Sequence, residues 1–355
     1  MPGDELCPTP AATDARLESL RGWLAQAPGG VAVDGASLRV ASSDASFRRY
    51  FRVDAQQPAR CIVMDAPPPH EDIAPFLHVA ALLRGGGVCA PAVYAADAQQ
   101  GFALLSDFGD VTYLQALHAA RAAGDARAAD ALMRRALTTL VRLQRIDAAT
   151  LPRYDEALLR RELDLFPQWY VTRHLGIEVD AAAQQVLRQV FAALLDNNLA
   201  QPAVFVHRDF HSRNLMVTAG HDDPGVLDFQ DAVRGPLSYD LVSLLRDAYI
   251  DWPEEQQIDW AVRYWEEARA AGLPVHTDFG DFYRDFEWMG LQRQLKVLGI
   301  FARLYHRDGK AQYLPDLPRV YGYAHAVATR YGALAPLARL LDRLHGVQPR
   351  AAYTF

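Results

Sequence analysis

Two neighbouring stretches of this chain decide its fold: HRDFHSRNLMV at residues 207–217 and VLDFQDA at residues 226–232. In both stretches the polar residues are next to apolar, strand-like runs. Loops on such a scaffold hold polar side chains rigidly where a ligand can reach them. The first stretch carries Asp209 and Asn214, and the second carries Asp228. Two carboxylates and an amide supply the hard oxygen ligands that Mg²⁺ prefers.

Phosphoryl transfer needs this set of side chains. One carboxylate accepts or orients the attacking hydroxyl, while an amide and a second carboxylate hold Mg²⁺ against the nucleotide phosphates. We therefore predict that Asp209 is the catalytic residue and that Asn214 and Asp228 are metal ligands. Their spacing matches the H-x-D-x-x-x-x-N catalytic loop and the D-F metal motif of protein kinases. We interpret His207 as a structural histidine that packs under the loop.

The overall composition excludes several other classes of protein. The chain has 355 residues, half of them hydrophobic, and a formal net charge of −7. An acidic balance argues against a general nucleic-acid coat, which needs a basic excess or a basic stripe. The three cysteines, Cys7, Cys61 and Cys89, have neither disulfide-framework nor zinc spacing. With no readable signal peptide and no membrane span, we expect a cytoplasmic protein without membrane or nucleic-acid partners.

The pattern of apolar residues changes once along the chain, from strand-like to helical. Residues 1–13 are rich in Pro, Thr and Ala and are predicted to be a disordered lead-in. Residues 14–105 are predicted to form a nucleotide-binding lobe that is mostly strand, and residues 106–355 a helical catalytic and substrate-binding lobe. The strands of the first lobe are expected at residues 38–41, 47–53, 61–64, 93–95 and 102–105. Helices are expected from residue 14 to the break at Pro28-Gly29-Gly30, at 73–83, 114–146, 156–175, 180–197 and 239–249, and from 253 to about 344. The fold class is therefore α+β with two lobes.

The loop residues, taken with VLDFQDAVRGPLSYDL at 226–241, resemble the aminoglycoside phosphotransferase and choline kinase group. Members of this group are small-molecule kinases with the protein-kinase fold. Within it, the segments at 46–53, 62–68, 243–253 and 298–319 resemble the anomeric kinases of cell-wall sugar recycling. The resemblance implies ATP and Mg²⁺ as cofactors and a C1 hydroxyl of N-acetylmuramate or N-acetylglucosamine as the acceptor.

The nucleotide site departs from the protein-kinase pattern in two ways. The turn at residues 42–46 has no glycine, so Ser43 and Ser46 are the candidates there for capping phosphates. The third strand ends in Met64-Asp65 where kinases place a lysine, and the only lysines are Lys296 and Lys310. Arg49 on the second strand is the candidate for the missing cation. The connector at residues 104–107 occupies the hinge position of kinases, where backbone groups, here those of Leu105 and Asp107, would bind the adenine.

Five further residues are candidate contacts to the substrate. His211 and Arg213 lie inside the predicted catalytic loop, and Arg246, Asp247 and Arg293 lie farther along the chain. An arginine at such a place can pair with the lactyl carboxylate of a muramic acid. Asp240 is interpreted as an acid that starts a helix or braces the loop.

Two alternatives to an amino-sugar kinase stay open. The first is an aminoglycoside or aminoalcohol phosphotransferase, because Asp247, Asp251, Glu254 and Glu255 offer negative charge to a cationic substrate. The second is a nucleotide-binding pseudokinase, because the third-strand lysine is missing. The sequence makes no prediction of the oligomeric state, of ATP against GTP, or of the preferred amino sugar.

Overall fold

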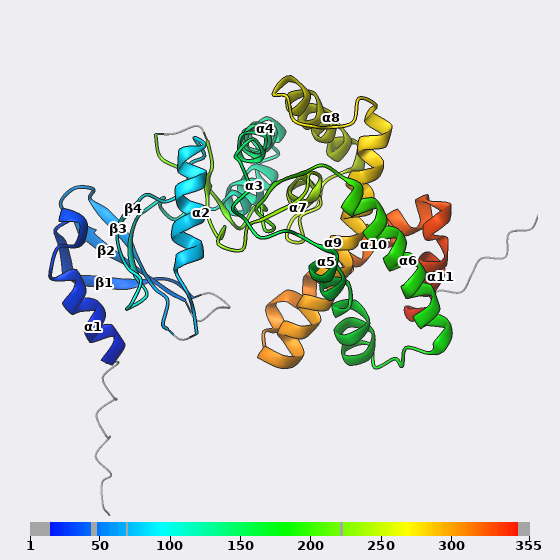
Figure 1. Cartoon of the computed structure of the whole chain (residues 1–355), viewed down its shortest axis with the longest axis horizontal. Coiled ribbons are helices and arrows are strands. Elements are labelled where there is room, and N and C mark those ends of the chain that lie inside the picture. Colours follow the sequence, from blue (N-terminus) through cyan, green and yellow to red (C-terminus); the bar gives the residue numbers. More distant parts are fainter. Residues whose placement is uncertain (1–14, 44–47, 69, 221–222, 347–355) are drawn as a thin grey trace, which may run out of the picture. The chain divides into compact units, whose positions relative to one another are not determined.

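The computed structural model describes residues 15–43, 48–68, 70–220 and 223–346. The chain divides into two compact units. The first comprises the described residues before Ala81 together with Pro91–Asp107. The second comprises Ala81–Ala90 and the described residues from Phe108 onward. Figure 1 shows the helices and strands of both units, coloured along the chain.

An antiparallel sheet of five strands forms the body of the first unit, in the order β1-β2-β3-β5-β4. Helix α1 (Ala15–Leu24) and the 3₁₀ turn η1 (Pro28–Gly30) precede it. The strands are β1 (Val33–Ser43), β2 (Arg49–Ala55), β3 (Arg60–Asp65), β4 (Val93–Asp97) and β5 (Phe102–Ser106). All five lie where the alternation of apolar residues predicts strands. The predicted helix at 73–83 is α2 (Ala74–Gly85).

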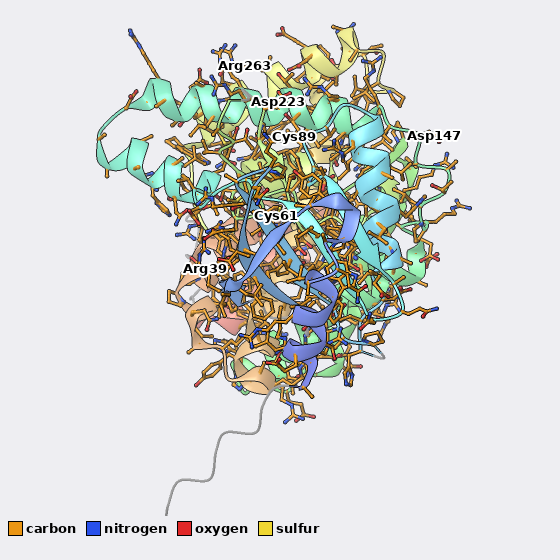
Figure 2. All side chains as sticks on the ribbon, turned by 90° about the vertical axis from the view of Figure 1, so that its left-hand side faces the viewer. Arg39, Cys61, Cys89, Asp147, Asp223 and Arg263 are labelled. Carbon is orange, nitrogen blue, oxygen red and sulfur yellow. The ribbon has the colours of Figure 1, made fainter. Side chains whose placement is uncertain are left out.

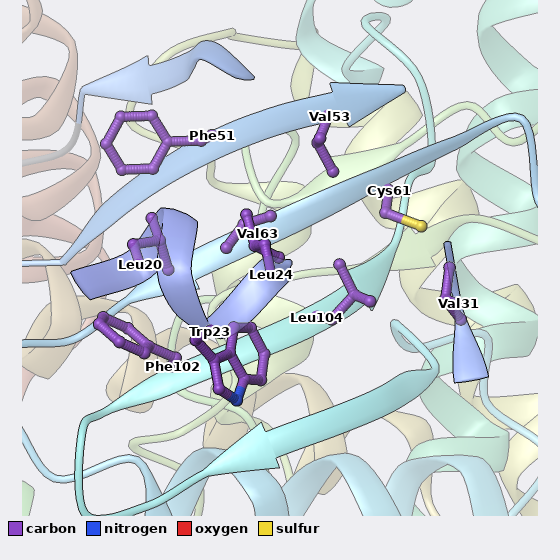
Figure 3. Close-up of a cluster of buried hydrophobic side chains, with 10 residues drawn as sticks. All are labelled: Leu20, Trp23, Leu24, Val31, Phe51, Val53, Cys61, Val63, Phe102 and Leu104. Atoms are coloured by element: carbon purple, nitrogen blue, oxygen red, sulfur yellow. The ribbon is translucent and has the colours of Figure 1, made fainter. Parts of the chain in front are cut away.

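Apolar side chains from α1 and from one face of this sheet form the core of the first unit. Period-two alternation places the apolar side chains of β2, β3 and β5 on that face, and the helix covers it. Figure 3 shows the cluster, which consists of Leu20, Trp23, Leu24, Val31, Phe51, Val53, Cys61, Val63, Phe102 and Leu104. Cys61 within it, like Cys89 in the second unit, carries a free thiol (both labelled in Figure 2).

The second unit is helical and contains two small antiparallel strand pairs. Its first helices are α3 (Tyr113–Ala122), α4 (Ala126–Gln144), α5 (Glu156–Leu163), η2 (Phe166–His174, a π-helix) and α6 (Ala181–Ala200). The strand pairs are β6 (Ala203–Val206) with β9 (Val233–Pro236), and β7 (Leu215–Met216) with β8 (Gly225–Val226). The remaining helices are α7 (Tyr239–Leu245), α8 (Glu254–Ala270), α9 (Phe279–Asp308), η3 (Ala311–Asp316), α10 (Leu317–Arg330), η4 (Gly332–Leu334) and α11 (Ala335–Leu344). Among the described helices, none combines the length and the apolar character that crossing a membrane requires.

The predicted α+β fold class is confirmed, but the prediction of one continuous helix at residues 114–146 is wrong. The chain leaves α3 and turns at Gly124, whose φ of 66° is a left-handed conformation that glycine adopts without strain. Asp125 then caps α4 by accepting a hydrogen bond from the Ala128 amide. Helical periodicity continued across the break, and only the Gly-Asp pair marked it.

Helix α9 packs closely against the chain that leads into η2. A Cβ built on Gly299 would lie 2.5 Å from the backbone carbonyl carbon and oxygen of Leu165. Real Cβ atoms essentially never come that close to another heavy atom. The absence of a side chain at Gly299 therefore sets the distance between α9 and this segment.

Gly299→Ala is expected to lower the free energy of unfolding by about 1–3 kcal/mol, because the backbone of Leu165 must shift. The matched control is Gly322→Ala in α10, where a Cβ would meet nothing within 4 Å. That substitution is expected to stabilise the helix by about 0.5–1 kcal/mol. Thermal unfolding of the two variants checks both signs, and equal effects would contradict the close approach.

Candidate functional site

The predicted catalytic loop joins two short strands of the second unit. It leaves β6, whose residues Val204–Val206 are buried, and enters β7, both of whose residues are buried. Phe210 is fully buried beneath the loop, while its neighbour Asp209 is partly exposed. The apolar anchors therefore fix the loop at both ends and at its centre, and the carboxylate of Asp209 is held at the surface of this unit.

The structure brings together the three residues predicted to carry the chemistry. The Asn214 side-chain Nδ2 donates to the Asp209 backbone carbonyl at 3.0 Å and to Asp228 Oδ2 at 3.3 Å. These bonds leave the amide Oδ1 of Asn214 without a hydrogen bond from the described residues. Asp228 has a φ of 62°, a strained conformation for a non-glycine residue that is found at functional sites. Asp228 Oδ1 accepts from Gln230 Nε2 at 2.8 Å, and the Asn214 amide oxygen and the Asp228 carboxylate are both hard ligands of the kind that Mg²⁺ prefers.

A buried carboxylate on α7 holds the backbone at the start of the loop. Asp240 accepts hydrogen bonds from the His207 amide at 2.6 Å and from the Arg208 amide at 2.9 Å. It is fully buried, and burial raises its pKa to about 7. The interpretation of Asp240 as a loop-bracing acid is confirmed by these two bonds.

His207 is a structural residue, as interpreted from the sequence. Its ring is fully buried, its Nδ1 accepts from the Asp209 amide at 3.2 Å, and its Nε2 donates to the Leu227 carbonyl at 3.0 Å. Burial lowers its pKa to about 4, so the neutral ring makes both bonds near neutral pH. The ring thus ties the catalytic loop to the strand region that carries Asp228.

A buried ion cluster lies under the same loop, and the sequence did not predict it. Glu162 on α5 accepts from Arg208 Nη2 at 2.6 Å and lies 3.0 Å from Lys296 Nζ on α9. The hydroxyl of Tyr154 also donates to Glu162. Burial alone would raise the pKa of Glu162, but the charges of Lys296 and Arg208 outweigh it and lower the pKa. One available signal was that Lys296 is one of only two lysines in the chain.

The ion cluster also sets the charge state of the predicted catalytic residue. Burial alone would raise the pKa of Asp209, but the positive charges of Lys296, Arg293 and Arg208 outweigh it, and the pKa falls to about 2. Asp209 is therefore ionised at neutral pH and can accept a hydrogen bond from a hydroxyl group.

Three of the predicted substrate contacts lie buried in this unit. Asp247 accepts from the Ser212 amide at 2.9 Å and from its hydroxyl at 2.5 Å, and so braces the loop. Arg246 is 4% exposed and forms an ion pair with Glu287 at 2.9 Å. Arg293 is 3% exposed, and its Nε and Nη1 have no hydrogen-bond partner among the described residues. Contact of these three residues with a substrate stays a prediction.

The other two predicted contacts, His211 and Arg213, both pack against the ring of Tyr249. The His211 ring lies edge-on to Tyr249 with centroids 5.4 Å apart, and burial lowers its pKa. Arg213 is exposed, and its guanidinium lies 4.6 Å from the centre of the Tyr249 ring. Both residues lie inside the loop, between Asp209 and Asn214.

The predicted nucleotide residues lie in the first unit. Arg49 donates from Nε and Nη2 to Asp65 Oδ2 at 2.9 and 2.6 Å, and Arg16 donates to Oδ1 of the same buried carboxylate. Asp65, in the position where kinases have a lysine, is thus enclosed by two arginines. The backbone of Ser43 pairs with Arg49 across β1 and β2, and Ser46 lies outside the described residues.

The end of β5 carries the other two nucleotide candidates. Leu105 is 2% exposed and pairs with Ile62 in the sheet. Arg52 Nη2 donates to Asp107 Oδ1 at 3.0 Å, and Arg52 Nε lies 2.7 Å from Asp107 Oδ2. The ion pair holds the Asp107 side chain against β2. The roles of Leu105, Asp107, Ser43 and Arg49 toward a nucleotide stay predictions.

Solved structures with low sequence identity share this fold. An aminoglycoside phosphotransferase with ADP bound superposes with a TM-score of 0.57 at 15% identity, covering 87% of this chain and 97% of the other. A choline/ethanolamine kinase family protein from Mesorhizobium loti superposes with the same TM-score and identity, covering 91% and 99%.

Relatives with much higher identity carry a common name. A protein from Pseudomonas aeruginosa named N-acetylmuramate/N-acetylglucosamine kinase is 47% identical over 93% of this chain and 97% of its own length. A protein of the same name from Neisseria meningitidis is 50% identical over 87% of this chain and 91% of its own length. Residues 37–279 match the family model described as phosphotransferase enzyme family. On this match and on identities near one half over most of the chain, the protein belongs to the phosphotransferase enzyme family.

Proposed function

We propose that this protein is a kinase that transfers the γ-phosphoryl group of ATP to the anomeric hydroxyl of N-acetylmuramate and N-acetylglucosamine. The observation that carries the proposal is the convergence of Asp209, Asn214 and Asp228 through the bonds of the Asn214 amide. The names of the relatives with 45–50% identity support the amino-sugar acceptor. Amino sugars of this kind come from peptidoglycan, so the proposed setting is cell-wall sugar recycling in the cytoplasm.

The proposed chemistry depends on how the loop presents Asp209. The ionised carboxylate accepts a hydrogen bond from the acceptor hydroxyl and aims its oxygen at the phosphorus atom. In a loose phosphoryl-transfer transition state the hydroxyl loses its proton late, so a weakly basic carboxylate is sufficient. The proton passes to Asp209 as the new O–P bond forms and the bond to ADP breaks. Asn214 and Asp228 would hold Mg²⁺, which neutralises charge on the phosphates when it is bound.

For the nucleotide, the charges around Asp65 replace the missing lysine. Arg16 and Arg49 bring two positive charges to one carboxylate, so the group keeps one net positive charge. We propose that Arg49, still 38% exposed in its side chain, offers this charge to the phosphates. Ser43 and Ser46 would cap phosphate oxygens, and Leu105 and Asp107 would bind the adenine.

Of the four acids that could attract a cationic antibiotic or aminoalcohol, three have partners within this unit. Asp247 is buried and accepts hydrogen bonds from Ser212. Asp251 pairs with Arg121 at 3.2 Å, and Glu254 pairs with Arg330. These pairs reduce the negative field expected for an aminoglycoside or choline site, which favours a neutral or anionic sugar.

A substrate panel tests the proposed function directly. ADP release is expected with N-acetylmuramate and N-acetylglucosamine, and not with kanamycin, choline or a methyl glycoside whose anomeric oxygen is blocked. Turnover of kanamycin or choline in preference to the sugars would favour the phosphotransferase alternative. Nucleotide binding without release of ADP with any acceptor would favour the pseudokinase.

Asp209→Asn is expected to lower kcat by roughly 10²–10⁴, the usual contribution of a positioned general base, with ADP affinity and thermal stability retained. The amide keeps the shape of the side chain but cannot accept the hydroxyl proton. Steady-state kinetics on both sugars checks this, with Asp196→Asn on the exposed face of α6 as the matched control. Near-full activity of Asp209→Asn would remove the residue from the mechanism.

Asn214→Ala and Asp228→Ala are each expected to raise the Mg²⁺ concentration that gives the half-maximal rate. Each substitution deletes one hard oxygen ligand from the proposed cation site. Titration of activity with MgCl₂ at saturating ATP measures the shift, and Asn197→Ala on α6 serves as the amide control. An unchanged Mg²⁺ dependence in both site variants would mean that the metal binds elsewhere.

A further inference from the structure

Arg213 differs from the other arginines predicted to contact the substrate. It is exposed, whereas Arg246 and Arg293 are 4% and 3% exposed. In the part of the chain that the structure describes, no carboxylate lies within ion-pair distance of its guanidinium. A cation without a carboxylate partner, placed next to a candidate metal ligand, is available to an anionic group of a bound molecule.

Aromatic side chains hold this arginine in place. Its guanidinium lies 4.6 Å from the ring centre of Tyr249 and 5.9 Å from that of Tyr313. The ring of Phe301 packs against both tyrosines, with centroids 6.0 and 5.1 Å apart. Stacking on aromatic faces orients a guanidinium without neutralising its charge. The side chain is thus preorganised for a planar anion.

The loop keeps Arg213 within a short distance of the predicted catalytic residue. The His211 amide donates to the Asp209 carbonyl at 3.0 Å, and the Asn214 amide donates to the His211 carbonyl at 2.9 Å. These two bonds fold residues 209–214 into consecutive tight turns. The backbone of Arg213 therefore lies close to that of Asp209, where the acceptor hydroxyl is proposed to bind.

The two proposed acceptors differ by one charged group near the reacting hydroxyl. N-acetylmuramate carries a lactyl ether with a carboxylate on C3, and N-acetylglucosamine has a hydroxyl there. An enzyme that accepts both sugars must bind the carboxylate when it is present and bear no large cost when it is absent. A buried arginine left without its anion is costly, whereas an exposed arginine stays hydrated. Of the three arginines, Arg246 already pairs with Glu287 and Arg293 is buried, whereas Arg213 is exposed and meets the requirement best.

We propose that Arg213, held by Tyr249 and Tyr313, pairs with the lactyl carboxylate of N-acetylmuramate and sets the preference between the two amino sugars. The proposal rests on the proposed function and deepens it. The pair is charge-assisted and matches the planar fork of a guanidinium to the two oxygens of a carboxylate. Glutamine at this position would keep hydrogen-bond donors but lose the charge.

The test is the ratio of kcat/KM for N-acetylmuramate to kcat/KM for N-acetylglucosamine. Arg213→Gln is expected to lower this ratio about tenfold, and Arg213→Lys is expected to restore part of it. Arg188→Gln, at an exposed arginine of α6, is the matched control and should leave the ratio unchanged. An unchanged ratio in Arg213→Gln, or an equal loss with both sugars, would overturn the proposal.

A change in the substrate provides a second test, and its main comparison uses only the unsubstituted enzyme. The methyl ester of N-acetylmuramate removes the negative charge and keeps the bulk of the lactyl group. The unsubstituted enzyme should discriminate against the ester, and Arg213→Gln should show no further loss with it. Equal use of acid and ester by the unsubstituted enzyme would also overturn the proposal. If that enzyme phosphorylates neither sugar, the proposed function itself fails, and this inference with it.

Discussion

The carboxylate of Asp240 fixes the start of the predicted catalytic loop, because it accepts hydrogen bonds from the backbone amides of His207 and Arg208. These amides begin a segment in which Arg208 has a φ of 78°, a conformation that is strained for any residue with a side chain. Such a conformation persists only where surrounding contacts hold the backbone in it. The two hydrogen bonds to Asp240 and the ion pair of the Arg208 side chain with Glu162 together hold the backbone of Arg208 in this conformation.

Buried ion pairs stabilise the rest of the site. Lys296 and Arg208 share Glu162, so the buried cluster keeps one net positive charge beside Asp209. That charge stabilises the ionised carboxylate on which the proposed hydroxyl contact depends. Asp247 braces the next part of the loop through Ser212. Removing one partner of a buried charge pair costs more than the pair contributes, so these residues act as a unit.

The sequence predicted the features that depend on local pattern. Apolar, strand-like runs predicted the five strands of the first unit, and the kinase-like spacing singled out Asp209, Asn214 and Asp228, which the structure links through the Asn214 amide. The pairings made by tertiary contact were not predictable, because Glu162 and Lys296 come from helices that are distant in the chain and carry no motif. In the same way, Asp65 signalled only a missing lysine, and the arginines that enclose it were visible only in the structure. Burial of Arg246 and Arg293 also follows from helix packing that periodicity alone does not give.

The central claim is that this loop directs phosphate to one oxygen of an amino sugar. Phosphorus NMR of the product formed from N-acetylmuramate, ATP and Mg²⁺ tests it most directly. The account predicts a single sugar phosphate whose phosphorus couples to the anomeric proton and whose phosphate is lost in mild acid. A signal that couples instead to the two protons on C6, and that survives mild acid, would contradict it.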